Sequence, residues 1–187
     1  MLVMPEIARE PTWNCIAVIP CLNEADALYD LIVRILRQLP AVLVVDDGSV
    51  DTTAARALAA GARVVRHPSN LGKGMALQTG FKHSRALGFT WAITLDGDGQ
   101  HAPEDIPLFL ACAQRTGADL VVGDRTHQRE KMPWLRRFVN RWMTAQISRL
   151  TGVRLPDSQC GFRLVKLNAI SQMTLRAKRF EAESEVL

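Results

Sequence analysis

The stretch WAITLDGDGQHAPEDIPLFLACAQR, residues 91–115, decides the fold. Its opening run, residues 91–95, is apolar and predicts a buried strand. A glycine-rich turn with Asp96 and Asp98 follows, and residues 103–115 have the pattern of a helix. A strand, a polar turn and a helix in this order form the repeating unit of α/β proteins. The two carboxylates repel each other at the end of a buried strand, and a cation bound between them would explain their presence.

The same unit recurs along the chain, because apolar runs alternate with helical patterns. The predicted strands cover residues 15–19, 42–45, 62–65, 91–95 and 119–122, and the predicted helices cover residues 26–39, 51–60, 74–87 and 103–115. Strands that are apolar on both faces are typical of parallel sheets. We therefore predict an α/β fold with a Rossmann-like, mostly parallel sheet and helices on both faces. Polar segments follow most of these strands, at the edge where such sheets bind ligands.

Length and composition predict one globular domain. The chain has 187 residues, of which 48% are apolar and 22% charged, and its net charge is +4. No run of roughly 18 apolar residues occurs, so the sequence encodes no transmembrane helix. The four cysteines form no CxxC pair, which favours reduced thiols and a cytoplasmic location.

The ends of the chain differ from its middle. We interpret residues 1–14 as a ragged leader and residues 15–187 as the single domain. Residues 179–187 have acids where a helix begins, and the sequence stops there, so we expect a domain truncated at its C-terminus. Before that point, residues 133–150 predict a long amphipathic helix and residues 155–165 a loop.

Three polar segments have both a structural and a functional interpretation. In IPCLNEA, residues 19–25, Asn23 is predicted to cap the next helix, which leaves Glu24 available for a ligand. In residues 45–53, Asp51 suits a helix N-cap, but the turn does not require Asp46 and Asp47, and acids in this place commonly bind ribose hydroxyls or a base. The third segment, residues 70–80, opens a helix with glycines and a lysine; it fits phosphate binding or a plain helix start.

The turn after residue 95 has the composition of a metal site. Residues two apart in an extended segment point to the same side, so Asp96 and Asp98 face one point, with Gln100 close behind. Their oxygens suit Mg²⁺ or Mn²⁺, and Mg²⁺ usually adds waters and substrate phosphates to one or two carboxylates. A turn with solvated acids is the alternative. An EF-hand is excluded, because its final glutamate is replaced by Pro107.

Taken in order, these segments resemble the family-2 glycosyltransferases. Within that family they look most like the polyprenyl-phosphate sugar transferases, the dolichyl-phosphate mannosyltransferase group. The segments that carry the resemblance are IPCLNEA (19–25), VVDDGSVDTT (44–53), NLGKGMALQTGF (70–81), TLDGDGQHAPEDIP (94–107), VGDR (122–125) and DSQCGFRLV (157–165). Cys21 and Leu22 depart from the family, which often has a small residue and an aromatic there. The QxxRW motif of processive polysaccharide synthases is absent.

The resemblance implies a GT-A fold, a UDP- or GDP-hexose donor and a Mg²⁺ or Mn²⁺ cofactor. By motif match, the nucleotide pocket would be lined by Pro20, Asn23 and Glu24. Base and ribose would be held by Asp46 and Asp47, and the donor would lie near Lys73. The metal would be bound by Asp96, Asp98 and Gln100, and the acceptor phosphate by Arg125 and Arg137. The resemblance thus gives the catalytic roles to Asp96, Asp98, Arg125 and Arg137.

The basic segment from Arg125 to Arg154 fits a phosphate acceptor. It has eight Arg or Lys against one acid, Glu130, and arginine binds phosphate oxygens bidentately. A phosphate monoester has a second pKa of about 6, so it is largely ionised at neutral pH and needs positioning rather than a base. The aromatic residues of this segment suit a peripheral membrane contact on the cytosolic face. No nucleic-acid motif accompanies the basic patch, so we expect no nucleic-acid partner.

The leading hypothesis is therefore a metal-dependent transferase that moves a hexose from a nucleotide sugar to a polyprenyl phosphate. Direct displacement inverts the anomeric carbon, and no clear second nucleophile for a retaining mechanism is present. Two alternatives stay open: the same fold acting on a soluble or saccharide hydroxyl, and a truncated nucleotide-binding module without catalysis. A nucleotidyltransferase, which would release pyrophosphate, fits less well. The sequence names neither the sugar nor the oligomeric state.

Overall fold

The structure, a computed structural model, describes residues 13–123 and 160–170. Six strands of this part form one sheet in the order β3-β2-β1-β4-β6-β5. They are β1 (Cys15–Cys21), β2 (Val42–Asp46), β3 (Arg63–Arg66), β4 (Trp91–Thr94), β5 (Leu120–Val122) and β6 (Arg163–Lys166). The pairs β1–β2, β2–β3 and β1–β4 are parallel, while β6 runs antiparallel to β4 and β5. The mostly parallel sheet is confirmed.

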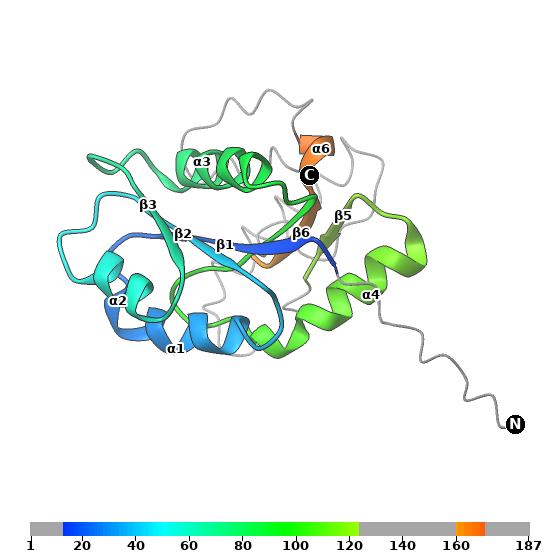
Figure 1. The fold of residues 1–187 in the computed structure, drawn as a ribbon, viewed down its shortest axis with the longest axis horizontal. Coiled ribbons are helices and arrows are strands. Elements are labelled where there is room, and N and C mark those ends of the chain that lie inside the picture. Colours follow the sequence, from blue (N-terminus) through cyan, green and yellow to red (C-terminus); the bar gives the residue numbers. More distant parts are fainter. Residues whose placement is uncertain (1–12, 124–159, 171–187) are drawn as a thin grey trace, which may run out of the picture.

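Helices cover both faces of the sheet, as predicted. They are α1 (Ala25–Ile35), α2 (Thr53–Ala59), α3 (Lys73–Ala86), α4 (Ile106–Thr116), which the short 3-10 helix η1 (Pro103–Asp105) precedes, and α6 (Leu167–Ile170). Figure 1 shows α1, α2 and α4 below the sheet and α3 and α6 above it. Two separate apolar cores match this layering, since side chains of α1, α2 and α4 pack in one and those of α3 and α6 in the other.

Two predictions about elements need correction. The loop predicted over residues 155–165 is wrong at its end, because β6 begins at Arg163 and pairs Ala92 with Val165. A buried arginine inside a four-residue strand hides the apolar pattern that identifies strands. The helix predicted to end at residue 39 ends at Ile35. Leu39 still packs in the core, but the following Pro40 disfavours helical backbone before it.

Several predicted segments lie wholly or mostly outside the described residues. They are residues 1–12 of the leader, the amphipathic helix over residues 133–150 and the helix start at residues 179–187. The last two residues of the predicted leader are described, and Asn14 Nδ2 donates to the Gly88 carbonyl at 2.8 Å. Within the described ranges, no helix combines the length and the apolar character that crossing a bilayer requires.

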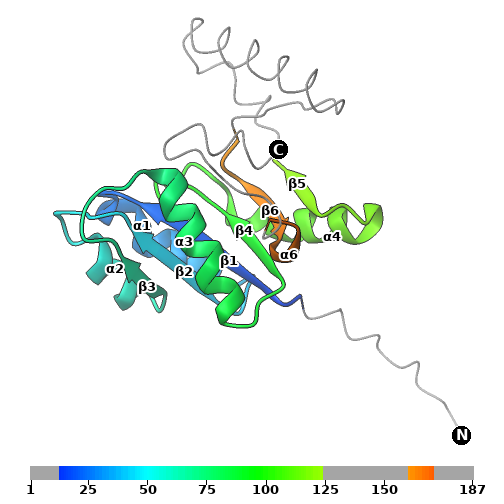
Figure 2. The ribbon, with the colours of Figure 1, turned by 90° about the horizontal axis from the view of Figure 1, so that it is seen from above.

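Helix α3 approaches the sheet closely at Gly80. Figure 2 shows α3 lying across β1 and β2, and a Cβ added at Gly80 would overlap the side chain of Val18 and touch Val45. Both valines are fully buried. The glycine therefore sets the distance between α3 and the sheet, and with it the position of the residues at the start of α3.

We expect Gly80→Val to destabilise the protein by about 2–3 kcal/mol, because added methyl groups in a packed core force side chains and backbone apart. Lys82→Val is the matched control on the same helix. Lys82 is exposed, so this change should cost no more than about 0.5 kcal/mol. Urea unfolding followed by circular dichroism measures both. Equal stability of the two variants would contradict the close approach of α3 at Gly80.

Candidate active site

The polar segments after the strands meet at the carboxyl edge of the sheet. The parallel register pairs Cys21 with Asp46 and Asp46 with Arg66, so the chain leaves β1, β2 and β3 at the same level. Asp47 N–H donates to the carbonyl of Cys21 at 2.8 Å, and His67 N–H donates to that of Asp46 at 2.9 Å. Sequence segments far apart are therefore fixed next to one another.

The loops after β1 and β2 hold each other through Asn23. Its backbone N–H donates to Ser49 Oγ and its Oδ1 accepts from Val50 N–H, both at 2.9 Å. The predicted helix cap at Asn23 is wrong: Glu24 is the N-cap residue of α1, without a side-chain cap, and Glu24 N–H donates to Thr53 Oγ1. Asn23 has a φ of 57°, a left-handed conformation that asparagine tolerates, which turns its side chain toward the other loop.

Asp51 supports the start of α2, but it is not the N-cap residue that we predicted. The N-cap residue is Thr52, one position closer to the helix. Asp51 Oδ1 accepts from the N–H and the hydroxyl of Thr53, and these hydrogen bonds hold the pKa of Asp51 below its usual value. Since Asp51 Oδ2 also accepts from Ala25 N–H at 3.4 Å, its carboxylate joins the starts of α1 and α2.

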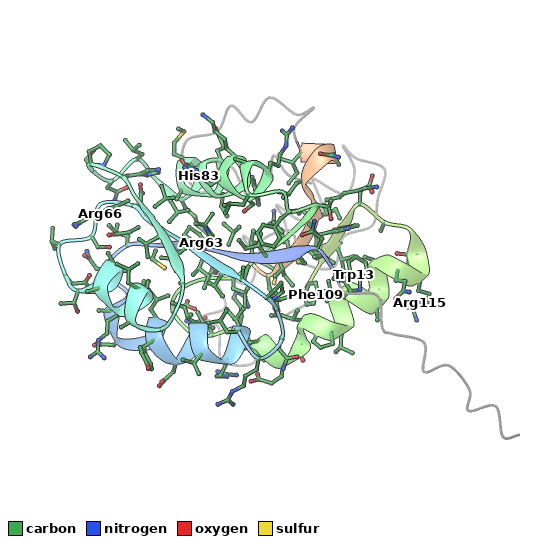
Figure 3. The ribbon with its side chains drawn as sticks, in the orientation of Figure 1. Trp13, Arg63, Arg66, His83, Phe109 and Arg115 are labelled. Carbon is green, nitrogen blue, oxygen red and sulfur yellow. The ribbon has the colours of Figure 1, made fainter. Side chains whose placement is uncertain are left out.

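The adjacent acids Asp46 and Asp47 are both buried, and both bind protein groups. Asp46 is 0% exposed; its Oδ1 accepts from Ser49 N–H at 2.9 Å. Arg66 Nε lies 3.2 Å from Asp46 Oδ2, but within the described residues this oxygen has no partner in hydrogen-bond geometry. Figure 3 shows Arg66 at the β3 end of the sheet, far from Phe109 and Arg115 on α4. Asp47 accepts from the N–H groups of Leu71 and Gly72 at 3.0 and 2.8 Å.

Asp96 is the centre of the charged cluster beyond β4. Lys73 Nζ, at the first residue of α3, lies 2.6 Å from Asp96 Oδ1, and His101 Nε2 lies 3.4 Å from Asp96 Oδ2. Burial alone would raise the pKa of Asp96, but the hydrogen bond with His101 and the charge of Lys73 outweigh it, so the pKa lies well below its usual range. Asp96 is thus an anion at any physiological pH.

A cleft of about 790 Å³ opens at this edge. Its described lining comprises Pro20, Cys21, Leu22, Glu24, Asp47, Asn70, Leu71, Gly72, Lys73, Ala76, Asp96, Gly97 and Asp98. Burial raises the pKa of Glu24, and the charges of Asp98, Asp96 and Asp51 add to the effect. Within this described lining, one positive side chain, Lys73, and several negative ones face the cleft, whose volume suits a drug-sized ligand.

Most of the predicted site residues meet in this cleft. Pro20, Glu24, Asp47, Lys73, Asp96 and Asp98 line it. Asn23, Asp46 and Gln100 are not part of its described lining, although the N–H of Gln100 donates to Asp98 Oδ1 at 2.9 Å. Arg125 and Arg137 lie outside the described residues.

The donor set of the cleft fits a divalent metal. Asp96 and Asp98 offer hard carboxylate oxygens on one lining. Among the described residues, no three acids, histidines or cysteines cluster closely enough to hold a metal alone. A site with two carboxylates, completed by water and substrate phosphate, is the usual arrangement for Mg²⁺ and does not require a third protein ligand.

Two residues that the sequence reasoning missed shape Asp96. His101 is buried, and its ring lies 5.2 Å from that of Phe162. A Cβ added at Gly161 would lie 2.7 Å from both carboxylate oxygens of Asp96. Thr94 Oγ1 donates to the Gly161 carbonyl at 2.7 Å, which holds this backbone against β4. The position of His101 beside Gln100 in the polar turn was a usable signal. Gly161 lies in the segment DSQCGFRLV that carries part of the family resemblance, but nothing in the sequence placed it beside Asp96.

Comparison with known proteins agrees with this geometry. Residues 16–174 match the family model described as glycosyl transferase family 2. The chain belongs to this family. It is 32% identical over 178 residues to the polyprenol monophosphomannose synthase of Mycolicibacterium smegmatis, a match that covers 89% of this chain and 67% of that protein. It is 29% identical over 170 residues to the dodecaprenyl-phosphate galacturonate synthase of Rhizobium johnstonii, covering 84% and 49%.

A solved structure shares the fold. Glucosyl-3-phosphoglycerate synthase from Mycobacterium tuberculosis, in complex with Mn²⁺, uridine-diphosphate-glucose and phosphoglyceric acid, superposes with a TM-score of 0.71 at 26% identity, covering 91% of this chain and 62% of that one. The predicted GT-A fold and the resemblance to the polyprenyl-phosphate group are confirmed. The chain spans about half to two thirds of the length of these three proteins.

We expect Gly161→Ala to weaken metal-dependent nucleotide binding at least tenfold, because the new methyl group occupies the space of the Asp96 carboxylate. Gly88→Ala is the control, since a Cβ there meets no atom within 4 Å. Its φ of 86° adds backbone strain, so the variant carries the cost of a strained alanine without a steric contact. Calorimetric titration of UDP and GDP with Mn²⁺ measures the effect. Normal binding by a folded Gly161→Ala variant would contradict the role of Gly161 beside Asp96.

Proposed function

We propose that this glycosyltransferase moves a hexose from a nucleotide-diphosphate sugar to a polyprenyl phosphate, with a divalent metal and with inversion at the anomeric carbon. One observation carries the proposal: Lys73, Asp96 and Asp98 line a single cleft at the carboxyl edge of the sheet. The names of the relatives in Mycolicibacterium and Rhizobium support the polyprenyl-phosphate acceptor. The neighbour bound to Mn²⁺ and UDP-glucose supports a nucleotide-sugar donor with a metal.

Different residues of the cleft would bind different parts of the donor. Pro20, Glu24 and Asp47 lie on the β1 and β2 side of the cleft, where the nucleoside would bind. Base and ribose contacts by Asp46 and Asp47, and a contact by Asn23, remain predictions. Lys73 stands at the N-terminus of α3, an end of a helix that favours negative charge, and would bind the diphosphate. Asp96 and Asp98, with Gln100, would hold Mg²⁺ or Mn²⁺, which supplies Lewis-acid stabilisation of the departing diphosphate.

The acceptor phosphate would be bound by residues of the basic segment. Arg125 and Arg137 are proposed to bind its phosphate, whose charge makes it a nucleophile without help from a base. Attack by a phosphate oxygen forms the new bond to the anomeric carbon as the bond to the diphosphate breaks, and the nucleoside diphosphate leaves. An acceptor with a lipid tail would place the enzyme in the cytoplasm, in peripheral contact with the cytosolic face of the membrane.

A soluble acceptor is the second candidate. The solved neighbour binds phosphoglyceric acid, which carries a phosphate but no lipid. The same cleft could thus serve a phosphorylated small molecule that offers a hydroxyl. Such an acceptor would require a general base to remove the hydroxyl proton.

A transfer assay distinguishes these functions. Labelled UDP- and GDP-hexoses are incubated with undecaprenyl phosphate or with 3-phosphoglycerate, and both products are identified. We expect sugar transfer to the lipid phosphate with release of a nucleoside diphosphate, abolished by EDTA and reduced at least roughly 100-fold by Asp98→Asn, since the charge that binds the metal is lost. Asp30→Asn, on the exposed face of α1, should keep full activity.

Three results would contradict the proposal. Transfer that survives both EDTA and Asp98→Asn would exclude the metal role of the cleft. Transfer to 3-phosphoglycerate alone would replace the lipid acceptor by the soluble one. Release of pyrophosphate would identify a nucleotidyltransferase.

A further inference from the structure

His67 joins three elements at the edge of the cleft without lining it. It follows β3 and is only 8% exposed. Its Nδ1 lies 2.6 Å from Asp47 Oδ1, beyond β2, and its Nε2 lies 2.9 Å from Thr79 Oγ1, on α3. A carboxylate only accepts hydrogen bonds, so Nδ1 donates to Asp47. The imidazole therefore fixes the direction in which the Asp47 carboxylate points.

Asp47 in turn fixes the backbone that leads into α3. Its two oxygens accept from Leu71 N–H and Gly72 N–H, the last residues before the helix begins at Lys73. Gly72 has a φ of 95°, which only glycine adopts readily. This backbone is thus held in an unusual conformation by the same carboxylate that His67 holds.

The segment of residues 67–72 also packs closely on the turn after β2. A Cβ at Gly48, whose φ is 82°, would lie 2.6 Å from the carbonyl carbon of Ser69. Arg66 donates to the Ser49 carbonyl at 2.5 Å. The contact at Gly48 limits movement of the segment toward β2, and Asp47 holds the end of the segment directly before Lys73, where Gly72 N–H also donates to Asn70 Oδ1 at 3.0 Å.

We propose that His67 is a positioning residue for Lys73: through Asp47 it holds the Leu71–Gly72 backbone that places the Lys73 ammonium on Asp96 and in the diphosphate part of the cleft. Lys73 Nζ lies 2.6 Å from Asp96 Oδ1, so a shift of the helix start changes this contact directly. A side chain that binds a ligand keeps its position only when neighbouring residues hold it there. The inference rests on the proposed function for the identity of the ligand. The part of the inference in which His67, through Asp47, holds the Leu71–Gly72 backbone does not depend on that function.

The first test needs no ligand. Amide hydrogen exchange is measured by NMR on the whole chain for wild type, His67→Ala, His67→Asn, Thr79→Val and His83→Asn. We expect His67→Ala to speed exchange of the Leu71 and Gly72 amides at least tenfold, because Asp47 loses the donor that orients it and keeps, among the described hydrogen bonds to its carboxylate, only those from the two amides themselves. The Asp47 amide donates to the Cys21 carbonyl. Its exchange rate should not change, which would show that the contact between the ends of β1 and β2 stays intact.

The other variants separate the bonds of the imidazole. Asparagine places an amide near the position of Nδ1, so His67→Asn should restore slow exchange to within about threefold of wild type. Thr79→Val removes only the Nε2 partner and should have little effect. The imidazole of His83, on α3 (Figure 3), bonds only the Thr79 carbonyl among the described hydrogen bonds, and His83→Asn is the histidine control. Unchanged exchange at residues 71 and 72 in His67→Ala would overturn the proposal.

The second test uses UDP or GDP with Mn²⁺ as the probe. His67→Ala should weaken nucleotide binding about tenfold in an otherwise wild-type chain and should have no further effect in a Lys73→Ala background. Equal losses of nucleotide affinity in both backgrounds would contradict the proposal that His67 acts through Lys73. If the wild-type chain binds neither nucleotide, the proposed function fails, and the exchange test still decides whether His67 holds the start of α3.

Discussion

The ion pair between Lys73 and Asp96 is the interaction on which the carboxyl edge of this sheet depends. It joins the first residue of α3, on one face, to the second residue after β4 in the middle of the sheet. A partly buried carboxylate without a partner would gain a proton or turn toward water, because removing an unpaired charge from water is costly. Lys73 and His101 keep Asp96 ionised at the floor of the cleft, where a metal or a phosphate can meet it.

The neighbourhood of Asp96 follows from the space that its carboxylate requires. Glycine stands at position 161 because a Cβ would contact both of its oxygens, and at position 97 because a Cβ would lie 2.8 Å from Cys21 Sγ. Burial raises the pKa of the Cys21 thiol, and the charge of Glu24 adds to this, so the thiol stays neutral beneath the acids. Cys21 and Gly97 are therefore small, uncharged residues in the lining of the cleft, beside the charged side chains of Glu24, Asp96 and Asp98.

The sequence was sufficient for features that depend on neighbouring residues and insufficient for those that depend on distant ones. The strand ending before Asp96 and the convergence of Glu24, Lys73 and Asp98 followed from local patterns and from the topology of parallel sheets. The antiparallel β6 was missed because its buried Arg163 interrupts the apolar pattern, and its pairing with β4 and β5 follows from no local pattern. The role of His67 was hidden for the same reason, since its partners Asp47 and Thr79 are 20 and 12 residues away. Asn23 was misassigned because only the positive φ reveals where its side chain points.

The measurement that tests the account most directly is calorimetric titration of UDP and of GDP into the chain, with and without Mn²⁺, for wild type and Asp98→Ala. The account predicts that one nucleotide binds tightly, that binding requires the metal, and that Asp98→Ala abolishes it. This result would establish the paired acids as a diphosphate–metal site and name the class of donor. Binding of neither nucleotide by the folded chain, or binding that ignores both metal and mutation, would contradict the account and leave Asp96 and Asp98 as acids of a solvated turn.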